Sequence, residues 1–526
     1  MSSTFFVYSD SFFHILYVYD VKVKRCLTDC SVLRTPTTLA SVYITQKERW
    51  KKMNQNLSLS FARNSQTLDR LFQGCDDIKK HTMKLGSETV DACIYYVEVA
   101  VDNMSVEESV IGKLLGRLMN LPKNEIYGFL AANALGITDV NELSTYDEVL
   151  MGVMVGDAVL IIDGYDKAIK IKSKGYPMMG VSSSEREEVM RGSREGFADA
   201  LKCNTALMRK RIRSNHLKVR EFIVGKESNT TVALVYLDNT VRTQVLQEIT
   251  SRINRLDISN LTDSGIIEQL TEENVYSPFP QYQTTERPDT AVHAIMKGRI
   301  TLFVDNTPVA LLLPANFNDF LKTPDDYYER YTIVTLARII RYLAAFFSLC
   351  LPAVYLAVMN YHPDILPANL LFSFAGGRAS VPFPSVVEVF IMEFAFELLR
   401  EAGIRIPGPM GSTIGIVGGL IIGQAAVSAG IVSPVIVVVV AFTALSSFAI
   451  PNNELSSAFR ILKYALLLLS YFLGFFGIVL GVLMIGLHLA SLKSFSLPYL
   501  MPIAAGDVNK RRDMKDLILR FPLKKL

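Results

Sequence analysis

A stretch of 40 residues, 411–450, contains no Asp, Glu, Lys or Arg. As one α-helix these 40 residues would extend ~60 Å, twice the ~30 Å hydrocarbon core of a bilayer. The Ser433-Pro434 step interrupts the stretch near its middle. We therefore expect two membrane spans here, over residues 411–430 and 435–450.

Two further apolar runs have the length of a membrane span. Residues 342–359 are uncharged and contain Pro352, which should kink the helix. Arg338 and Arg341 precede this run, and positive residues favour the cytoplasmic side, so the run should begin there. Residues 464–487 form the last predicted span.

A fifth apolar segment, residues 386–399, is unusual because it carries acids. They are Glu388, Glu393 and Glu397, with Glu401 just beyond. Residues 393, 397 and 401 share one helix face, and carboxylates in lipid are costly, so this face should meet water, protein or a cation path. Two interpretations stay open. Either Glu393 and Glu397 line a cation path, or the helix lies at the membrane surface with acids in the headgroup layer or paired with basic residues (Arg338, Arg341 and Arg405).

The number of membrane crossings is predicted to be four or five. Residues 493–526 form a basic tail, and Arg460 and Lys463 precede the last span. Positive residues favour the cytoplasm, so a cytoplasmic tail needs an even number of crossings. The acid-bearing segment is then the one that fails to cross.

Small residues recur at every fourth position at the start of the uncharged stretch. They are Gly411, Gly415, Gly419 and Gly423. In a membrane this spacing produces a smooth stripe against which another helix packs closely. We predict a helix-packing site along these glycines.

The N-terminal half has soluble patterning and contains two similar segments, residues 156–171 and 298–313. Each combines a strand, an Asp-Gly or Asp-Asn turn and a second strand, which is the signal of a β-hairpin. Further strands are predicted over residues 92–101 and 231–237. A divergent duplication and two unrelated folds that share a hairpin both fit this pattern.

The predicted fold class is an α/β cytoplasmic region of two subdomains followed by an all-α multi-pass transmembrane domain. The expected divisions are a poorly structured extension, two α/β subdomains, a transmembrane domain of four or five hydrophobic segments, and the basic tail (residues 1–52, 53–181, 188–330, 333–492 and 493–526).

Composition restricts the functional classes. A net charge of +3 is too small to indicate nucleic-acid binding. The basic helix predicted over residues 192–213 is interpreted as a solvated face near lipid headgroups, with an anion or partner site as the alternative. The six scattered cysteines lack zinc spacing and suit a reducing cytoplasm. The sequence shows no catalytic motif, so we expect no enzyme, no metal and no cofactor.

Several motifs resemble those of one known family, the A subunits of bacterial spore germinant receptors. They are SREGF, LMRKRI and LKV within residues 193–219, ERPD and PDDYYER within 286–330, ELLREAG and IPGP within 397–409, and GSTIGIVGG and GQAAV within 411–427. The resemblance covers about residues 60–515 and leaves the N-terminal extension outside.

This resemblance implies a multi-pass sensor in the inner membrane of an endospore, with its N-terminal domain in the core. It implies two partners, a multi-pass B subunit that binds the nutrient and a lipoprotein C subunit. Copies of the A subunit are expected to form a ring, with five as the expected number, that acts as a nutrient-gated cation channel. The triggering nutrient is not evident from the sequence.

In a ring whose copies pack along the glycine stripe, the residue opposite the stripe would line the pore. Relative to Gly415, Val417 lies about 200° round the helix, on the face opposite the stripe. A branched apolar side chain there would gate a pore by excluding water, while the simpler interpretation is an apolar residue that faces lipid. Two other functions stay open: a membrane-anchored scaffold without a pore, and a component of a solute permease.

Overall fold

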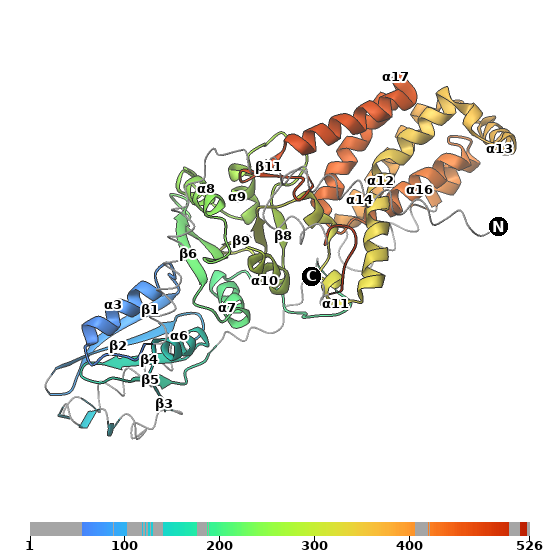
Figure 1. Cartoon of the computed structure of the whole chain (residues 1–526). Helices are drawn as coiled ribbons and strands as arrows, with labels where there is room; N and C mark the ends of the chain where they lie inside the picture. The colour runs from blue at the N-terminus through green and yellow to red at the C-terminus, as the bar shows by residue number, and fades with distance from the viewer. Residues whose placement is uncertain are drawn as a thin grey trace, which may run out of the picture.

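The computed structural model places two β-sheets and a helical bundle one after another along the chain (Figure 1). It describes residues 55–87, 89–101, 118, 121–122, 125–126, 128–129, 140–175, 187, 189–405, 419, 421–503 and 516–522. The predicted extension over residues 1–52 lies outside these ranges.

The first sheet is antiparallel and has the strand order β1-β2-β4-β5-β3. Its strands are β1 (Ile78–Leu85), β2 (Val90–Val97), β3 (Val140–Leu143), β4 (Ala158–Ile162) and β5 (Ala168–Ile171). Helices α3 (Phe61–Leu71) and α6 (Tyr146–Met154) pack on one face, where Cys93 and Tyr95 of β2 point. Ile94, between them, points to the opposite face, as strand alternation requires.

The second sheet repeats this order as β6-β7-β9-β10-β8. Its strands are β6 (Leu217–Val224), β7 (Thr230–Leu237), β8 (Gln283–Thr285), β9 (Ile300–Val304) and β10 (Ala310–Leu313). Helices α7 (Leu201–Arg211) and α10 (Pro288–Met296) cover one face, and α8 (Thr243–Asn254) and α9 (Ser264–Thr271) cover the other. The shared order of all five strands favours the duplication hypothesis over a shared hairpin alone.

Both predicted hairpins are confirmed. Leu160 of β4 pairs with Ile169 of β5, and Leu302 of β9 pairs with Leu311 of β10. Gly164 in the first turn has a positive φ of 84°, which glycine adopts without steric cost. Local turn chemistry therefore determines these pairings.

A buried ion pair joins the two subdomains. Arg209 of α7 donates two hydrogen bonds of 2.7 Å to the Asp77 carboxylate and a third, of 2.9 Å, to the Leu217 carbonyl. Arg209 is 0% exposed and Asp77 is 1% exposed. The predicted solvated face of this basic helix therefore does not include Arg209, for which the prediction is wrong. Lys202 does lie at the surface, where it pairs with Glu98 at 2.6 Å.

The C-terminal half is a bundle of helices. Its described elements are η2 (Phe317–Leu321), α11 (Asp325–Tyr328), α12 (Tyr331–Tyr361), η3 (Pro363–Ile365), α13 (Ala368–Arg378), α14 (Ser385–Arg405), α16 (Pro434–Phe448) and α17 (Asn453–Ser491), followed by the short strands β11 (Lys493–Ser494) and β12 (Leu497–Pro498). Among the helices described, α12 and α17 are long and apolar enough to cross a membrane. Helix α16 begins at Pro434, where the break was predicted.

Side-chain contacts give each helix a direction. We call the end of the bundle that contacts the second subdomain the near end, and the opposite end the far end. Helix α12 runs to the far end, where the Tyr361 hydroxyl donates a hydrogen bond to the Tyr471 carbonyl. Helix α14 starts beside it, because the Ser385 hydroxyl lies 2.6 Å from Asn360 Oδ1. Helix α14 therefore runs back toward the near end.

The last predicted span, residues 464–487, is interrupted within its first half, because α17 reverses direction. Gly474 inside it has φ 59° and ψ −138°, which no α-helix contains. Phe279 of the second subdomain contacts both Phe459 and His488, with ring centroids 6.2 and 5.9 Å apart. A straight helix would separate positions 459 and 488 by ~44 Å. Helix α17 therefore consists of two antiparallel arms. The first arm begins at the near end, and the second arm returns to it.

The chain after α17 returns to the second subdomain. The Ser494 hydroxyl donates a hydrogen bond to the Gln281 carbonyl, and the Phe495 ring packs edge-on against Tyr282. The segment 516–522 also packs beside α11 and α12. Part of the predicted basic tail is thus packed against the protein and lies on the same side of the bundle as the two sheets.

Candidate functional site: paired charges in the helical bundle

The acids of α14 form a row of four ion pairs along the helix, which we call the charge row. The pairs are Glu388–Arg378 (3.2 Å), Glu393–Lys463 (2.5 Å), Glu397–Arg460 (3.1 Å) and Glu401–Arg405 (2.8 Å). Burial decreases along the row: Glu388 and Glu393 are 0% and 1% exposed, whereas the side chain of Glu401 is 61% exposed. The acid-bearing helix is therefore part of the bundle and deeply packed at its far end.

The interpretation in which the acids pair with nearby arginines is only partly right. Arg405 holds Glu401, one turn away. Arg338 and Arg341 instead contact Asp326, at 2.8 and 2.9 Å. Glu393 and Glu397 take their partners from the first arm of α17, and Glu388 takes its partner from the end of α13.

Sequence reasoning missed those partners because they are distant along the chain. Lys463 is 70 residues from Glu393, and Arg460 is 63 residues from Glu397. A signal did exist, since Arg460 and Lys463 are spaced by three residues at the start of an apolar run and so share a helix face. Two acids on one helix and two bases on another form complementary faces.

Each buried pair leaves one carboxylate oxygen without a hydrogen bond. Among the described residues, Glu388 Oε1, Glu393 Oε1 and Glu397 Oε1 are buried and lack a hydrogen-bond partner. A carboxylate can accept about four hydrogen bonds, so these oxygens keep capacity for water or a cation. The charge row is therefore neutral overall but not fully satisfied.

The described part of the glycine stripe faces two directions. A Cβ on Gly423 would lie 3.3 Å from Val437 of α16, so this glycine packs within the chain. A Cβ on Gly419 would have no heavy atom of the described residues within 4 Å. Gly411, Gly415 and Val417 lie outside the described residues.

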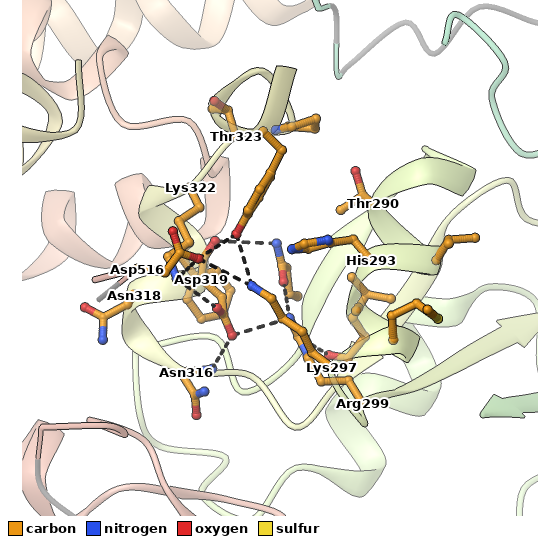
Figure 2. A pocket seen from close by; sticks show the side chains of 18 of the residues that line it. Thr290, His293, Lys297, Arg299, Asn316, Asn318, Asp319, Lys322, Thr323 and Asp516 are labelled. Atoms are coloured by element: carbon orange, nitrogen blue, oxygen red, sulfur yellow. Dashed lines mark hydrogen bonds and ion pairs between the residues drawn. The ribbon is translucent and has the colours of Figure 1, made fainter. Parts of the chain in front are cut away.

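A second polar site lies where the second subdomain meets the near end of the bundle. A cavity of about 860 Å³ is lined by α10, η2 and α11, with Asp516 from the tail. In Figure 2 the Lys297, Lys322 and Asp516 side chains point into the same region of this cavity. Asp516 lies 3.5 and 3.7 Å from the two lysines and 2.9 Å from the buried Arg338.

Burial and neighbouring charges together determine the protonation of Asp516 and His293 in this cavity. Burial opposes ionisation of Asp516, but Lys322, Arg338 and Lys297 outweigh it and hold the pKa of Asp516 far below its usual value. Burial, assisted by Lys297, lowers the pKa of His293 to about 4, so this imidazole is neutral at physiological pH. Asp516 thus acts as a permanent anion that ties the tail to α12 through Arg338.

Acids beside the start of α17 should make stability depend on pH. Burial, followed by repulsion from Glu454 and Glu272, raises the pKa of Glu268 to about 8. Between its usual 4.5 and about 8, folded Glu268 keeps a proton that the unfolded chain releases, so stability falls as pH rises through this window. We expect Glu268→Gln to flatten that fall, measured as the apparent unfolding temperature of the detergent-purified protein against pH. Glu227→Gln, at an exposed acid of the same subdomain, should leave the profile unchanged, and a wild-type profile for Glu268→Gln would contradict the assignment.

Comparison with known proteins places the chain in a family. The family described as Bacillus/Clostridium GerA spore germination protein matches residues 66–526. The chain is 38% identical to the uncharacterized membrane protein YfkQ of Bacillus subtilis (strain 168), over 90% of this chain and 92% of that protein. It is 36% identical to spore germination protein KA of the same strain, over 89% of this chain and 85% of that protein.

A solved structure shows a further likeness, to the N-terminal domain of the A subunit of the Bacillus megaterium spore germinant receptor GerK3. It covers 50% of this chain and 98% of that domain, with 26% identity and a TM-score of 0.39. The family match by itself spans the second half of the first subdomain's helix α3, both sheets and the helical bundle. The chain belongs to the GerA family of Bacillus and Clostridium spore germination proteins.

Proposed function

We propose that this chain is the A subunit of a nutrient-sensing spore germinant receptor and that its copies assemble into a ligand-gated cation channel. Membership of the GerA family supports the process of spore germination. The observation that carries the channel proposal is the charge row inside an apolar bundle. Ionisable groups among membrane helices are costly and commonly mark ion pathways.

Individual residues have distinct proposed roles in this channel. Glu393 and Glu397 line the cation path, and their unpartnered oxygens are the atoms available to a passing cation. Val417 gates the path, and the glycine stripe packs between copies. None of the described residues lies within 4 Å of a Cβ at Gly419, which supports a packing partner from outside the chain.

The proposed assembly is a homo-oligomer of about five copies that works with a multi-pass B subunit and a lipoprotein C subunit. It lies in the inner membrane of the spore as a multi-pass protein, with both sheets in the core. The packing of residues 516–522 against α11 and α12 supports a tail on the same side as the sheets. The reversal of α17 adds one change of direction to the helical segments, so the chain returns to the end of the bundle that contacts the sheets. This return also supports a tail on the same side as the sheets.

A membrane-anchored scaffold without a pore is the second candidate. It is favoured by the pairing itself, because every acid of α14 has a base within 4.0 Å in the same chain. Paired charges can stabilise an anchor without conducting ions.

Flux measurements separate the two functions. The full-length protein would be reconstituted in liposomes loaded with potassium, alone and with its B and C subunits, and its copy number read by crosslinking and mass. A channel predicts a closed homo-oligomer and a basal potassium leak that rises in Val417→Ala, because a wider apolar constriction wets more easily. Equal flux from wild-type, Val417→Ala and empty liposomes would favour the scaffold.

Assembly should depend on the open side of the glycine stripe. We expect Gly419→Leu to reduce ring assembly and germination while leaving the amount of membrane-bound protein unchanged, because a leucine holds packed helices apart. Crosslinking of native membranes measures assembly. Gly486→Leu is the matched control, since a Cβ at Gly486 of α17 also meets no atom within 4 Å in the part of the chain that the structure describes, and that position should face lipid. Normal assembly of Gly419→Leu would place the stripe against lipid.

A further inference from the structure

A small polar cluster lies at the far end of the bundle, where four segments meet. Tyr355 comes from α12, Arg378 ends α13, Glu388 lies in the first turn of α14, and Ser433 precedes α16. Glu388 and Ser433 are 0% exposed, and Tyr355 is 7% exposed. The Tyr355 hydroxyl interacts with the Ser433 side chain.

The Glu388 carboxylate contacts a helix N-terminus on one side. Its Oε2 accepts a hydrogen bond of 3.0 Å from the Ser433 N–H, at the N-terminus of α16. The positive end of a helix dipole stabilises an anion at this position. One oxygen of the carboxylate is thus bonded to that helix end, while Oε1 lies beside Arg378.

The opposite side of the carboxylate is incompletely satisfied. Glu388 Oε1 lies 3.2 Å from Arg378 Nη2, yet no hydrogen bond forms. Among the described residues the buried Arg378 Nε also lacks a hydrogen-bond partner, and the Ser433 Oγ and Tyr355 hydroxyl have no partner beyond one another. One buried carboxylate oxygen and two buried hydroxyl oxygens therefore come from the three segments that meet beside the Arg378 guanidinium. Oxygen ligands of this kind suit hard cations.

Arg378 is the member of the cluster that can leave. It ends α13, a helix that projects from the tip of the bundle (Figure 1) and has no buried residue. The side chain of Arg378 is 25% exposed, whereas Lys463, which pairs with Glu393 deeper in the bundle, is 5% exposed. A shift of α13 would remove the guanidinium without disturbing the core of the bundle.

We propose that Glu388, Ser433 and Tyr355 form a binding site for a monovalent metal cation, sodium or potassium, and that Arg378 occupies this site in the present conformation. One carboxylate balances one positive charge, so a monovalent ion replaces the guanidinium without leaving net charge in a low-dielectric region. Arg378 is then a tethered competitor of the free ion. The site's part in conduction rests on the proposed channel function, but ion binding itself does not.

The test uses the full-length protein purified in detergent, with apparent unfolding temperature as the readout. Arg378→Gln empties the site and keeps Glu388, so sodium or potassium chloride should raise its unfolding temperature, increasingly with concentration, relative to choline chloride at equal ionic strength. The wild-type protein and the double variant R378Q/E388Q should show no difference between the salts. Arg405→Gln, which removes an exposed arginine from the Glu401 pair on the same helix, is the matched control and should show none either.

Two outcomes would overturn the site. One is an R378Q protein whose stability is the same in all three salts. The other is an R378Q protein that fails to fold at every sodium or potassium concentration while R378Q/E388Q folds, because a metal ion would then be unable to replace the guanidinium. A cation-dependent R378Q that conducts no ions in liposomes would instead leave the site in place and remove the channel.

Discussion

Replacing Asp77 with Ala should lower the free energy of unfolding of the soluble half by about 3–5 kcal/mol. The change leaves Arg209, which is 0% exposed, without its anion at the junction of the two subdomains. A buried charge without a partner retains its full desolvation cost, while the remaining bond to the Leu217 carbonyl compensates only in part. Limited proteolysis of the full-length protein across a urea series would measure the loss.

A surface ion pair across the same junction provides the control. Lys202 pairs with Glu98 at 2.6 Å, but the lysine side chain is 67% exposed. Solvent screens such a pair, so Lys202→Met should cost no more than about 1 kcal/mol. Equal protease resistance of the Asp77 and Lys202 variants would show that the buried pair does not hold the subdomains together.

Replacing Glu393 with Gln should remove most of the correctly assembled protein from the membrane. The side chain of Lys463 is 5% exposed, and its ammonium would lose the carboxylate that compensates it, at a cost of about 3–5 kcal/mol. The double variant E393Q/K463Q removes both charges and should restore the amount of protein. If Glu393 lines a cation path, the restored protein should still release ions slowly after the nutrient is added.

The partly exposed pair of the charge row is the control for this experiment. Glu397 and Arg460 have side chains that are 22% and 29% exposed, so Glu397→Gln should keep protein levels near those of the wild type. Membrane immunoblots and potassium release measure the two effects separately. Wild-type ion release from E393Q/K463Q would limit Glu393 to a structural role.

Short-range features were well predicted from the sequence. The turn at Asp163-Gly164 brings β4 and β5 together, and the turn at Asp305-Asn306 does the same for β9 and β10. These pairings depend on residues adjacent along the chain, so turn chemistry and alternation were sufficient. The break before α16 was likewise local, because proline at the first helical position favours a helix start there.

Features that depend on distant residues were missed. Asp77 and Arg209 are 132 residues apart, and no local pattern indicates their bond. The reversal at Gly474 was missed because Gly477, Gly481 and Gly486 follow in the same apolar run and have similar sequence context. Only the packing of the two arms, with Leu466 close against Gly481, selects the position of the turn.

The sequence by itself determined the family, the division into an α/β half and an apolar half, and the presence of acids among apolar helices. These follow from composition, periodicity and motifs, which are properties of neighbouring residues. The tertiary structure alone decided which base neutralises each acid, because Lys463 and Arg460 reach Glu393 and Glu397 only when α17 packs beside α14. A buried charge is stable only beside its counter-charge, so three-dimensional packing, and not spacing along the chain, determines those partners.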